Sequence, residues 1–302
     1  MVVSFGYTGY KNARFGRIEA HQAICAYARE ILLKTVNICE EADFEIIHAI
    51  IDAVYIKKKN YSVKEIEQII EKANLQTSME LLVEGVFKWI VFLPSVKHSK
   101  IAAITRFFGA YINGDYKIRG IHLRRRDTPF AIKKMQEEQI LVFGKANNAF
   151  EFKQKIPLAI GKMKEWIGKL NNDLIPVEHL KIKKVVSKSL EEYKVNCAQK
   201  AVLKQLKQQG TEIFPGESIN FVYTNTNSPK YINRVKVFDK NLKIDKEKYK
   251  ELFIRATHEM LNFSGLTKKK LELLSENTIQ KVLVDFVGEK VVQKIKKVPV
   301  PV

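Results

Sequence analysis

The spacing of apolar residues predicts a helix followed by a β-hairpin near the start of the chain. In residues 17–37 apolar side chains recur every three or four positions, which is typical of an amphipathic helix. Two short β-branched runs follow, EIIHAII at residues 45–51 and VYIKK at residues 54–58. They flank Asp52 and Ala53, so we expect a hairpin with the Asp52 carboxylate at or near its turn.

The next residues continue this alternation of helices and strands. The sequence SVKE places Ser62 at a helix N-cap and Glu65 three residues later, as in a capping box. The runs SMELLVEGVFKWIVFLP and ITRFFGAYING predict strands, and Asn113-Gly114 predicts a hairpin turn. By contrast, the opening SFGYTGYKNARFG is rich in glycine and aromatic residues and is typical of loops and turns.

Helical patterns dominate from about residue 120 onward. They occupy the sequences IKKMQEEQILVFGKA, EFKQKIPLAIGKMKEWIGKL and NCAQKAVLKQLKQQG, and a short strand-like segment, GESINFVYTN, follows them. We therefore expect an α+β protein, with an antiparallel sheet and packed helices in residues 1–120 and a mostly helical domain in residues 121–265. Residues 266–302 are lysine-rich and predict a C-terminal helix and tail.

The charge of the chain points to a polyanionic partner. It has 52 Lys and Arg residues against 33 Asp and Glu residues, a formal net charge of +19 at pH 7. Such an excess most often indicates nucleic acid. A lysine-rich proteome would explain scattered lysines, but not lysines that cluster.

Cysteine usage and hydropathy restrict the class of protein further. Cys25, Cys39 and Cys197 form no CxxC pair, which argues against a zinc site or a disulfide framework. No apolar run reaches the ~18 residues of a membrane span. The N-terminal residues also lack the pattern of a signal peptide. We expect a cytoplasmic protein with no membrane partner.

Two segments carry candidate chemistry beside Asp52. A carboxylate at a strand turn can bind Mg²⁺ in a phosphoryl-transfer site, although the hairpin alone favours an ordinary polar turn residue. Residues 119–129, RGIHLRRRDTP, contain Arg124, Arg125 and Arg126, whose planar side chains suit phosphate. The alternative there is a solvated edge strand, and Asp127 could neutralise one arginine.

The second segment is a lysine cluster in residues 181–208. It has the lysines Lys181, Lys183, Lys184, Lys188, Lys194, Lys200, Lys204 and Lys207, and only two glutamates. Ser187, Ser189 and Tyr193 are interleaved with them, as in a surface that contacts a nucleic-acid backbone. A solvated helix face explains any single lysine equally well.

Taken in order, these segments resemble the C-terminal part of family B DNA polymerases. FGYTGYKNARFGRIEAHQAICAYAREIL resembles the stretch that begins in their YGxxGY motif and runs into a palm helix. IIDAVYI resembles the palm Asp-x-Asp hairpin, and LLVEGVFKWIVFLPS the strands that follow it, with Glu84 at a position that is often acidic. RFFGAY is similar to the Lys-x-Tyr region, and RGIHLRRRDTP to the RG(I/L)ExxRRD segment before the thumb. VSKSLEEYK and IFPGESINFVY resemble thumb segments, so the resemblance extends to about Leu261.

The chain also departs from the family pattern in its palm motifs. The first Asp of the hairpin corresponds to Ile50, Asp52 takes the second position, and Ala53 replaces a Ser. Val2-Val3 stand where the family has Asn-Ser. The nucleotide-binding Lys of that motif would lie before Met1. The first palm motif, the exonuclease domain and most of the fingers have no counterpart in these residues.

The resemblance implies the palm and thumb of a split archaeal polymerase. A two-Mg²⁺ site would take Asp52, and more weakly Glu84, from this chain and its other ligands from an N-terminal subunit with the exonuclease, fingers and first palm motif. The other partners would be primer–template DNA and dNTP. The implied DNA-binding residues are Tyr7, Gly9, Tyr10, Arg14, Arg106, Arg124, Arg125, Arg126, Lys184, Lys188, Tyr193 and Lys194.

Two further interpretations remain open. Ile50 and Ala53 favour a catalytically degenerate accessory subunit that grips primer–template duplex. From Gln280, QKVLVDFV has the Gln-x-x-Leu-x-x-Phe spacing of sliding-clamp-binding peptides, but it also fits an ordinary amphipathic helix, which we favour.

Overall fold

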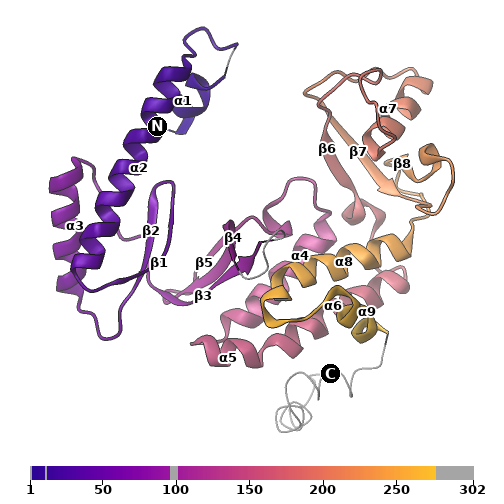
Figure 1. The fold of residues 1–302 in the computed structure, drawn as a ribbon. Helices are drawn as coiled ribbons and strands as arrows, with labels where there is room; N and C mark the ends of the chain where they lie inside the picture. Colours follow the sequence, from indigo (N-terminus) through magenta and orange to yellow (C-terminus); the bar gives the residue numbers. More distant parts are fainter. Residues whose placement is uncertain (1, 11, 96–100, 277–302) are drawn as a thin grey trace. The chain divides into compact units, whose positions relative to one another are not determined.

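The computed structural model describes residues 2–10, 12–95 and 101–276, and its backbone forms two compact units (Figure 1). The first unit comprises Met1–Gly85 and the second Val86–Val302. None of the helices among the described residues is long and apolar enough to span a membrane.

The first unit packs two helices against the Asp52 hairpin. Its elements are α1 (Val2–Thr8), α2 (Ile18–Glu41), β1 (Glu45–Ile50), β2 (Ala53–Lys57) and α3 (Val63–Thr77). The core is small and contains Ile38, Cys39, Phe44, Ile69 and Ala73. It buries only the C-terminal end of α2, so most of this long helix is exposed. The predicted helix, hairpin and capping box are confirmed.

The opening residues differ from the prediction because α1 is helical. The ring of Phe5 stacks on His21 of α2 with 4.3 Å between centroids, and the Phe5 carbonyl oxygen lies 3.1 Å from His21 Nδ1. These contacts with α2 stabilise a helical turn that the glycine-rich sequence alone does not favour. The turns expected in this region begin after Thr8.

The second unit is built on an antiparallel meander covered by helices. Its strands are β3 (Phe87–Pro94), β4 (Ala102–Tyr111) and β5 (Tyr116–Arg119), in that order. The helices are α4 (Phe130–Gly144), α5 (Ala149–Gln154), α6 (Ile156–Asn171), α8 (Lys246–Leu261) and α9 (Lys268–Ser275). Residues of the sheet and of these helices share one continuous apolar core. There is therefore no break in the core at residue 120, and the functional division at that position remains a prediction.

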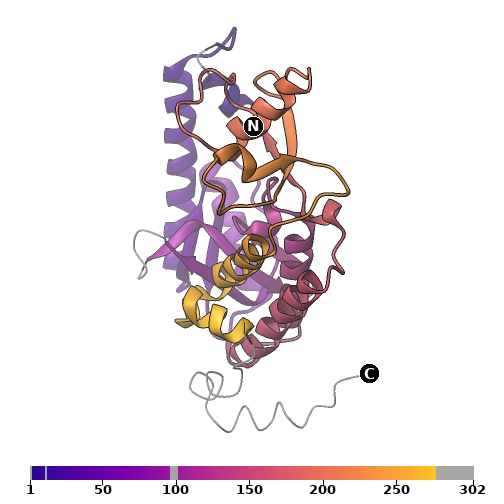
Figure 2. The ribbon, with the colours of Figure 1, turned by 90° about the vertical axis from the view of Figure 1, so that its right-hand side faces the viewer.

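A smaller layer lies at one end of this unit, beyond the N-terminal end of α8 in both views (Figures 1 and 2). Its strands β6 (Ile182–Val185), β7 (Ser218–Tyr223) and β8 (Val235–Val237) form an antiparallel sheet. Helix α7 (Ala198–Gln208) covers one face through a separate apolar core. Short 3₁₀ turns complete the unit: η1 (His122–Arg124), η2 (Val177–Leu180), η3 (Tyr231–Asn233) and η4 (Asn262–Ser264).

One strand prediction needs adjustment, and one turn prediction is confirmed. The strand predicted from Ser78 begins only at Phe87, and residues 78–86 have no regular structure. Ser78 ends α3 with a left-handed φ of 54°, and Asn74 Oδ1 accepts a hydrogen bond from the Leu81 backbone N–H at 2.7 Å, which holds the chain out of a sheet. The Asn113-Gly114 turn is present between β4 and β5, with Gly114 at a φ of 95°.

Candidate active site and nucleic-acid interface

The Asp52 carboxylate lies at the tip of a tight two-residue turn. Ile50 pairs with Ala53 across the hairpin, so Ile51 and Asp52 alone connect the strands. Ile51 has a φ of 52°, a conformation that is costly for a β-branched residue. Its side chain is 75% exposed, and Asp52 is exposed as well. The turn thus presents the carboxylate to solvent on a strained backbone, a feature that clusters at functional sites.

The base of the hairpin is fixed by a polar network. Lys58 Nζ donates to the Ala42 carbonyl oxygen at 3.0 Å and to Glu65 Oε1 at 2.8 Å. Glu65 Oε2 accepts from the Ser62 backbone N–H at 2.7 Å and closes the capping box. The hydrogen bond from Lys58, and then those from Ser62, lower the pKa of Glu65 to about 2. This network ties the hairpin to the start of α3.

The residues of this chain fit one part of a Mg²⁺ site. Mg²⁺ is commonly held by one or two carboxylates together with substrate phosphates, and Asp52 can supply one such ligand. Ile50, on β1, has no group that coordinates a metal. Glu84 is exposed within irregular residues of the same unit. Throughout the described residues no cluster of three His, Cys, Asp or Glu side chains could hold a metal ion.

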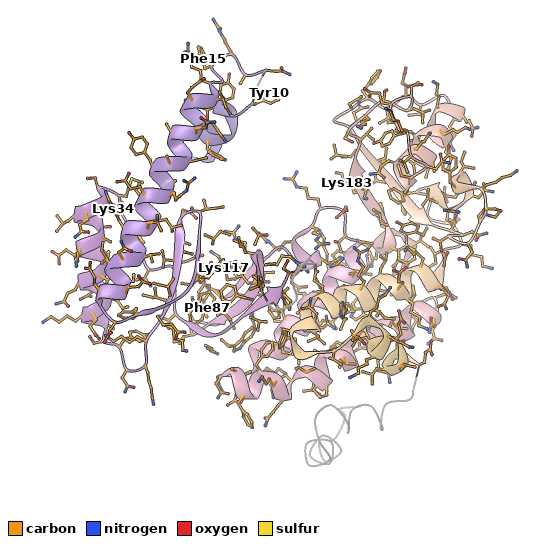
Figure 3. The ribbon with its side chains drawn as sticks, viewed as in Figure 1. Tyr10, Phe15, Lys34, Phe87, Lys117 and Lys183 are labelled. Carbon is orange, nitrogen blue, oxygen red and sulfur yellow. The ribbon has the colours of Figure 1, made fainter. Side chains whose placement is uncertain are left out.

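The aromatic–glycine segment lies around the N-terminal end of α2 (Figure 3). Tyr7 and Tyr10 are exposed by 44% and 57%. Gly9 packs so close to α2 that an added Cβ would lie 2.7 Å from His21 Nδ1, so a larger residue would require the His21 side chain to shift. Arg14 is exposed, with its guanidinium carbon 5.4 Å from the centroid of Phe15. Two phenols and one guanidinium of the candidate set are therefore open to a ligand.

The arginine segment is anchored to α8 by a buried carboxylate that the sequence did not point to. Glu259 Oε1 accepts hydrogen bonds at 2.6 Å from both Arg106 Nη2 and Arg125 Nη2. Its Oε2 accepts from the His122 backbone N–H at 2.9 Å and also contacts His122 Nδ1. Burial would raise the pKa of Glu259, but the hydrogen bond and charge of His122 and the charge of Arg125 outweigh it and lower the pKa.

This network divides the predicted arginines into two groups. Arg106 and Arg125 are held by Glu259, whereas Arg124 and Arg126 are exposed at η1 and just after it. Asp127 forms an ion pair with Lys184 Nζ of β6, at 3.8 Å, and not with a neighbouring arginine. The contact connects the arginine segment to the smaller layer.

The lysine cluster is divided between the two faces of the smaller layer. Ile182 and Val235 point into the core beneath α7, so alternation along β6 and β8 turns Lys183 and Lys236 to the opposite face. Lys183 extends from β6 in Figure 3. Lys188 and Lys194 are exposed in the connection from β6 to α7. Tyr193, in the same connection, packs on the α7 core, and its hydroxyl oxygen is buried.

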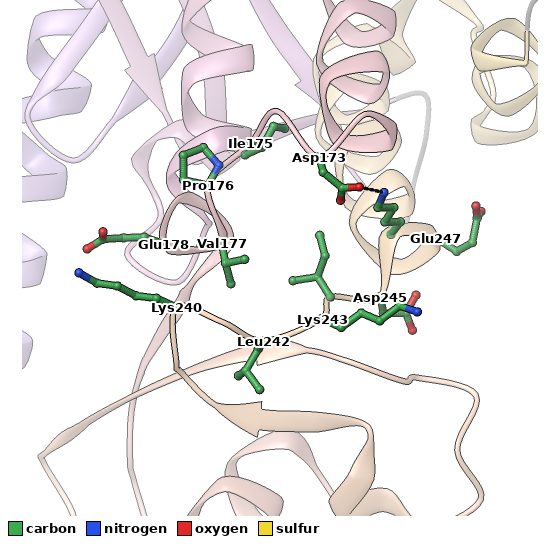
Figure 4. A pocket seen from close by; sticks show the side chains of 12 residues that line it. Asp173, Ile175, Pro176, Val177, Glu178, Lys240, Leu242, Lys243, Asp245 and Glu247 are labelled. Carbon is green, nitrogen blue, oxygen red and sulfur yellow. Dashed lines mark hydrogen bonds and ion pairs between the residues drawn. The ribbon is translucent and has the colours of Figure 1, made fainter.

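A hollow of about 740 Å³ lies elsewhere in the second unit, between residues 173–178 and 240–247 (Figure 4). Its lining includes Glu178 and Glu247 as well as Lys240 and Lys243, and an ion pair joins Asp173 to Lys246 at 2.7 Å. This mixed charge is unlike a polyanion site, and none of the predicted site residues lines the hollow.

Comparison with known proteins connects these features to one family. The family model for DNA polymerase family B matches residues 3–264. The chain is 31% identical to DNA polymerase 2 of Saccharolobus solfataricus over 154 residues. This alignment covers 51% of the chain and 23% of that protein. It is also 26% identical to DNA polymerase 1 of Sulfurisphaera ohwakuensis over 277 residues. That alignment covers 90% of the chain and 30% of the relative.

A solved structure shares the fold of the chain. The structure of the family B DNA polymerase from the hyperthermophilic archaeon Pyrobaculum calidifontis matches 87% of this chain and 32% of its own length, with a TM-score of 0.58 and 21% identity. The chain thus spans about a quarter to a third of the polymerases it matches. Since the family model covers most of its residues, this chain belongs to DNA polymerase family B.

Proposed function

We propose that this chain is the palm-and-thumb subunit of a split family B DNA polymerase. Residues 1–120 would form most of the palm, residues 121–265 the thumb, and residues 266–302 a C-terminal helix and tail. An N-terminal subunit would supply the exonuclease domain, the fingers and the first palm motif. The observation that carries the proposal is Asp52, a single exposed carboxylate on a strained turn inside the region matched by the family.

In this proposal Asp52 contributes one ligand of a two-Mg²⁺ site, and Glu84 is a weaker candidate. When bound, the metal ions would favour attack by the primer 3′-hydroxyl on a dNTP and stabilise the charge that develops on its phosphates. The Lys58–Glu65 network fixes the base of the hairpin that carries Asp52. Exposed Tyr7, Tyr10, Arg14, Arg124 and Arg126 would contact DNA.

The remaining DNA-binding candidates fall into two kinds. Lys184, Lys188 and Lys194 would contribute sequence-independent phosphate contacts. The other four would hold neighbouring DNA-contacting residues in position: Gly9, Arg106, Arg125 and Tyr193. Gly9 packs on His21, both arginines are bound to Glu259, and Tyr193 packs on the core of the smaller layer.

The test is reconstitution with the partner. The full chain is used to capture its partner, and primer extension is measured with and without it. We expect extension only in the complex, and Asp52→Ala should reduce its rate by at least about 10²-fold. Glu45→Gln, at the other end of the same hairpin, is the matched control and should leave the rate unchanged. An Asp52→Ala complex that extends primers at the wild-type rate contradicts the proposal.

A second readout does not depend on turnover. Mn²⁺ binding to the complex with primer–template and dNTP should weaken in Asp52→Ala and remain in Glu45→Gln. Ile50 and Ala53 support the alternative of a catalytically degenerate accessory subunit. That alternative predicts salt-dependent binding of primer–template, no nucleotide incorporation with any partner, and no effect of Asp52→Ala on Mn²⁺ binding.

A further inference from the structure

An open groove of about 470 Å³ runs beside α7 in the smaller layer of the second unit. Three lysines, a tyrosine, a leucine and a glutamine line it: Leu190, Lys200, Lys204, Lys207, Gln208 and Tyr231. The groove therefore combines cationic and apolar groups within one concave surface. None of these residues belongs to the hairpin or the arginine segment, or lines the mixed-charge hollow of Figure 4.

The cations of the groove are available to an anion. Lys200, Lys204 and Lys207 recur at helical spacing and extend over about 10 Å of the axis of α7. Among the described residues Lys200 and Lys204 have no carboxylate within ion-pair distance. Lys207 pairs with Glu191 at 3.1 Å, but both side chains are more than 60% exposed, and such pairs contribute little. A phosphate can displace Glu191 at small cost.

The apolar side of the groove favours a base over a bare phosphate. Tyr231 belongs to η3 and, with Leu190, packs on the core between α7 and the sheet. Its ring is therefore partly buried against that core and also lines the groove. Aromatic rings beside a row of cations are the arrangement that binds single strands, because unpaired bases offer a face for stacking. The bases of an intact duplex are already stacked on one another and offer no such face.

The groove and the sheet face that points away from α7 lie on opposite sides of the smaller layer. Lys183 and Lys236 project from the side of the sheet away from α7, whereas Lys200, Lys204 and Lys207 lie on the outer side of α7. One helix and one sheet lie between the two basic surfaces. A rigid duplex on one face would leave the other open to a different segment of nucleic acid.

We propose that the groove beside α7 binds unpaired nucleotides of a DNA strand. The three lysines would contact successive phosphates of that strand, and Tyr231 would stack on a base. This inference goes beyond the proposed function, because a chain that does not polymerise can still bind a single strand here.

The test measures binding of fluorescent dT12 to the full chain by anisotropy between 50 and 200 mM salt. The double variant Lys200→Gln/Lys204→Gln should make the slope of log K against log salt shallower by about 1.4, since each phosphate contact on a single strand contributes about 0.7. Tyr231→Leu should weaken binding about tenfold, and Tyr231→Phe should retain it. Lys183→Gln/Lys236→Gln is the charge-matched control and should leave the dT12 slope unchanged.

Three outcomes would overturn the inference. The first is an unchanged dT12 slope in Lys200→Gln/Lys204→Gln, and the second is an equal change in the control. The third is displacement of dT12 by inorganic triphosphate as effectively as by unlabelled dT12 at equal phosphate concentration, which would identify a simple anion site. Loss of primer–template binding or extension concerns the proposed function alone and does not change how the dT12 result is interpreted.

Discussion

At the residue scale, Glu259 is the charge on which the arginine segment depends. Its side chain is 5% exposed and faces Arg106, Arg125 and His122. Glu259→Gln should lower the free energy of unfolding by about 2–3 kcal/mol, because two guanidinium groups lose their counter-charge. The value lies below the ~3–5 kcal/mol of fully buried pairs since Arg125 is partly exposed.

Urea unfolding followed by tryptophan fluorescence measures this change. Trp89 and Trp166, the two tryptophans of the chain, both lie in the second unit, and Trp166 stacks on Phe253 of α8. The matched control is Glu137→Gln, which removes an exposed carboxylate paired with Lys134 and should change stability by less than about 1 kcal/mol. Equal stabilities for the two variants would show that the Glu259 network contributes nothing.

The same carboxylate predicts a pH dependence. Its pKa is lowered in the folded chain, so its contribution is fully present above the ordinary value of 4.5 and is lost as pH falls through the folded pKa. Protonated Glu259 is neutral, as glutamine is. The stability difference between wild type and Glu259→Gln should therefore be greatest near pH 7 and shrink steadily below about pH 4.5. A difference that stays constant down to pH 3 would contradict the assigned charge interactions.

At the element scale, the Ser62 cap should stabilise α3 and with it the hairpin. Ser62→Ala removes the acceptor of the Glu65 backbone N–H, which lies 3.2 Å from Ser62 Oγ, and should cost about 1 kcal/mol. Labelling of Cys39 reports on this unit, because the thiol is buried in a core shared with Ile69 and Ala73 of α3. In a Cys25→Ser/Cys197→Ser background the labelling rate should rise about fivefold.

Ser62→Thr is the control for this prediction because threonine also caps helices. Its labelling rate should stay close to that of Ser62. Burial, followed by the charge of Glu40, raises the pKa of Cys39, so the folded chain reacts slowly and opening of the core limits the signal. Identical rates for the alanine and threonine variants would show that the cap does not stabilise this unit.

The elements that the sequence predicted best are those with local signals. The hairpin around Asp52 and the Ser62–Glu65 cap depend on residues only a few positions apart. Glu259 could not be found this way, because Arg106 and His122 lie 153 and 137 positions from it along the chain. The lysines of residues 181–208 are neighbours in sequence, yet the fold sends them to opposite faces. Only the alternation of apolar Ile182 with charged Lys183 indicated that the lysines lie on two faces.

At the scale of the whole molecule, the two units differ greatly in how much apolar surface they bury. The first relies on the small core around Ile38 and Phe44, whereas the second shares one extensive core between its sheet and helices. Stability rises with the apolar area that folding buries. With so small a core, the first unit should have the lower free energy of unfolding of the two.

This contrast predicts two separate unfolding transitions in urea. Cys39 lies in the first unit and both tryptophans in the second, so thiol labelling and fluorescence each follow one unit. Cys39 should become reactive at a lower urea concentration than the midpoint of the fluorescence change, since the small core of the first unit gives it the lower free energy of unfolding. If the proposed N-terminal subunit binds the first unit, it should raise the Cys39 midpoint and leave the fluorescence midpoint almost unchanged. If both probes instead give one midpoint in the isolated chain, the two units unfold as a single cooperative body, and the small core alone does not set the stability of the hairpin that carries Asp52.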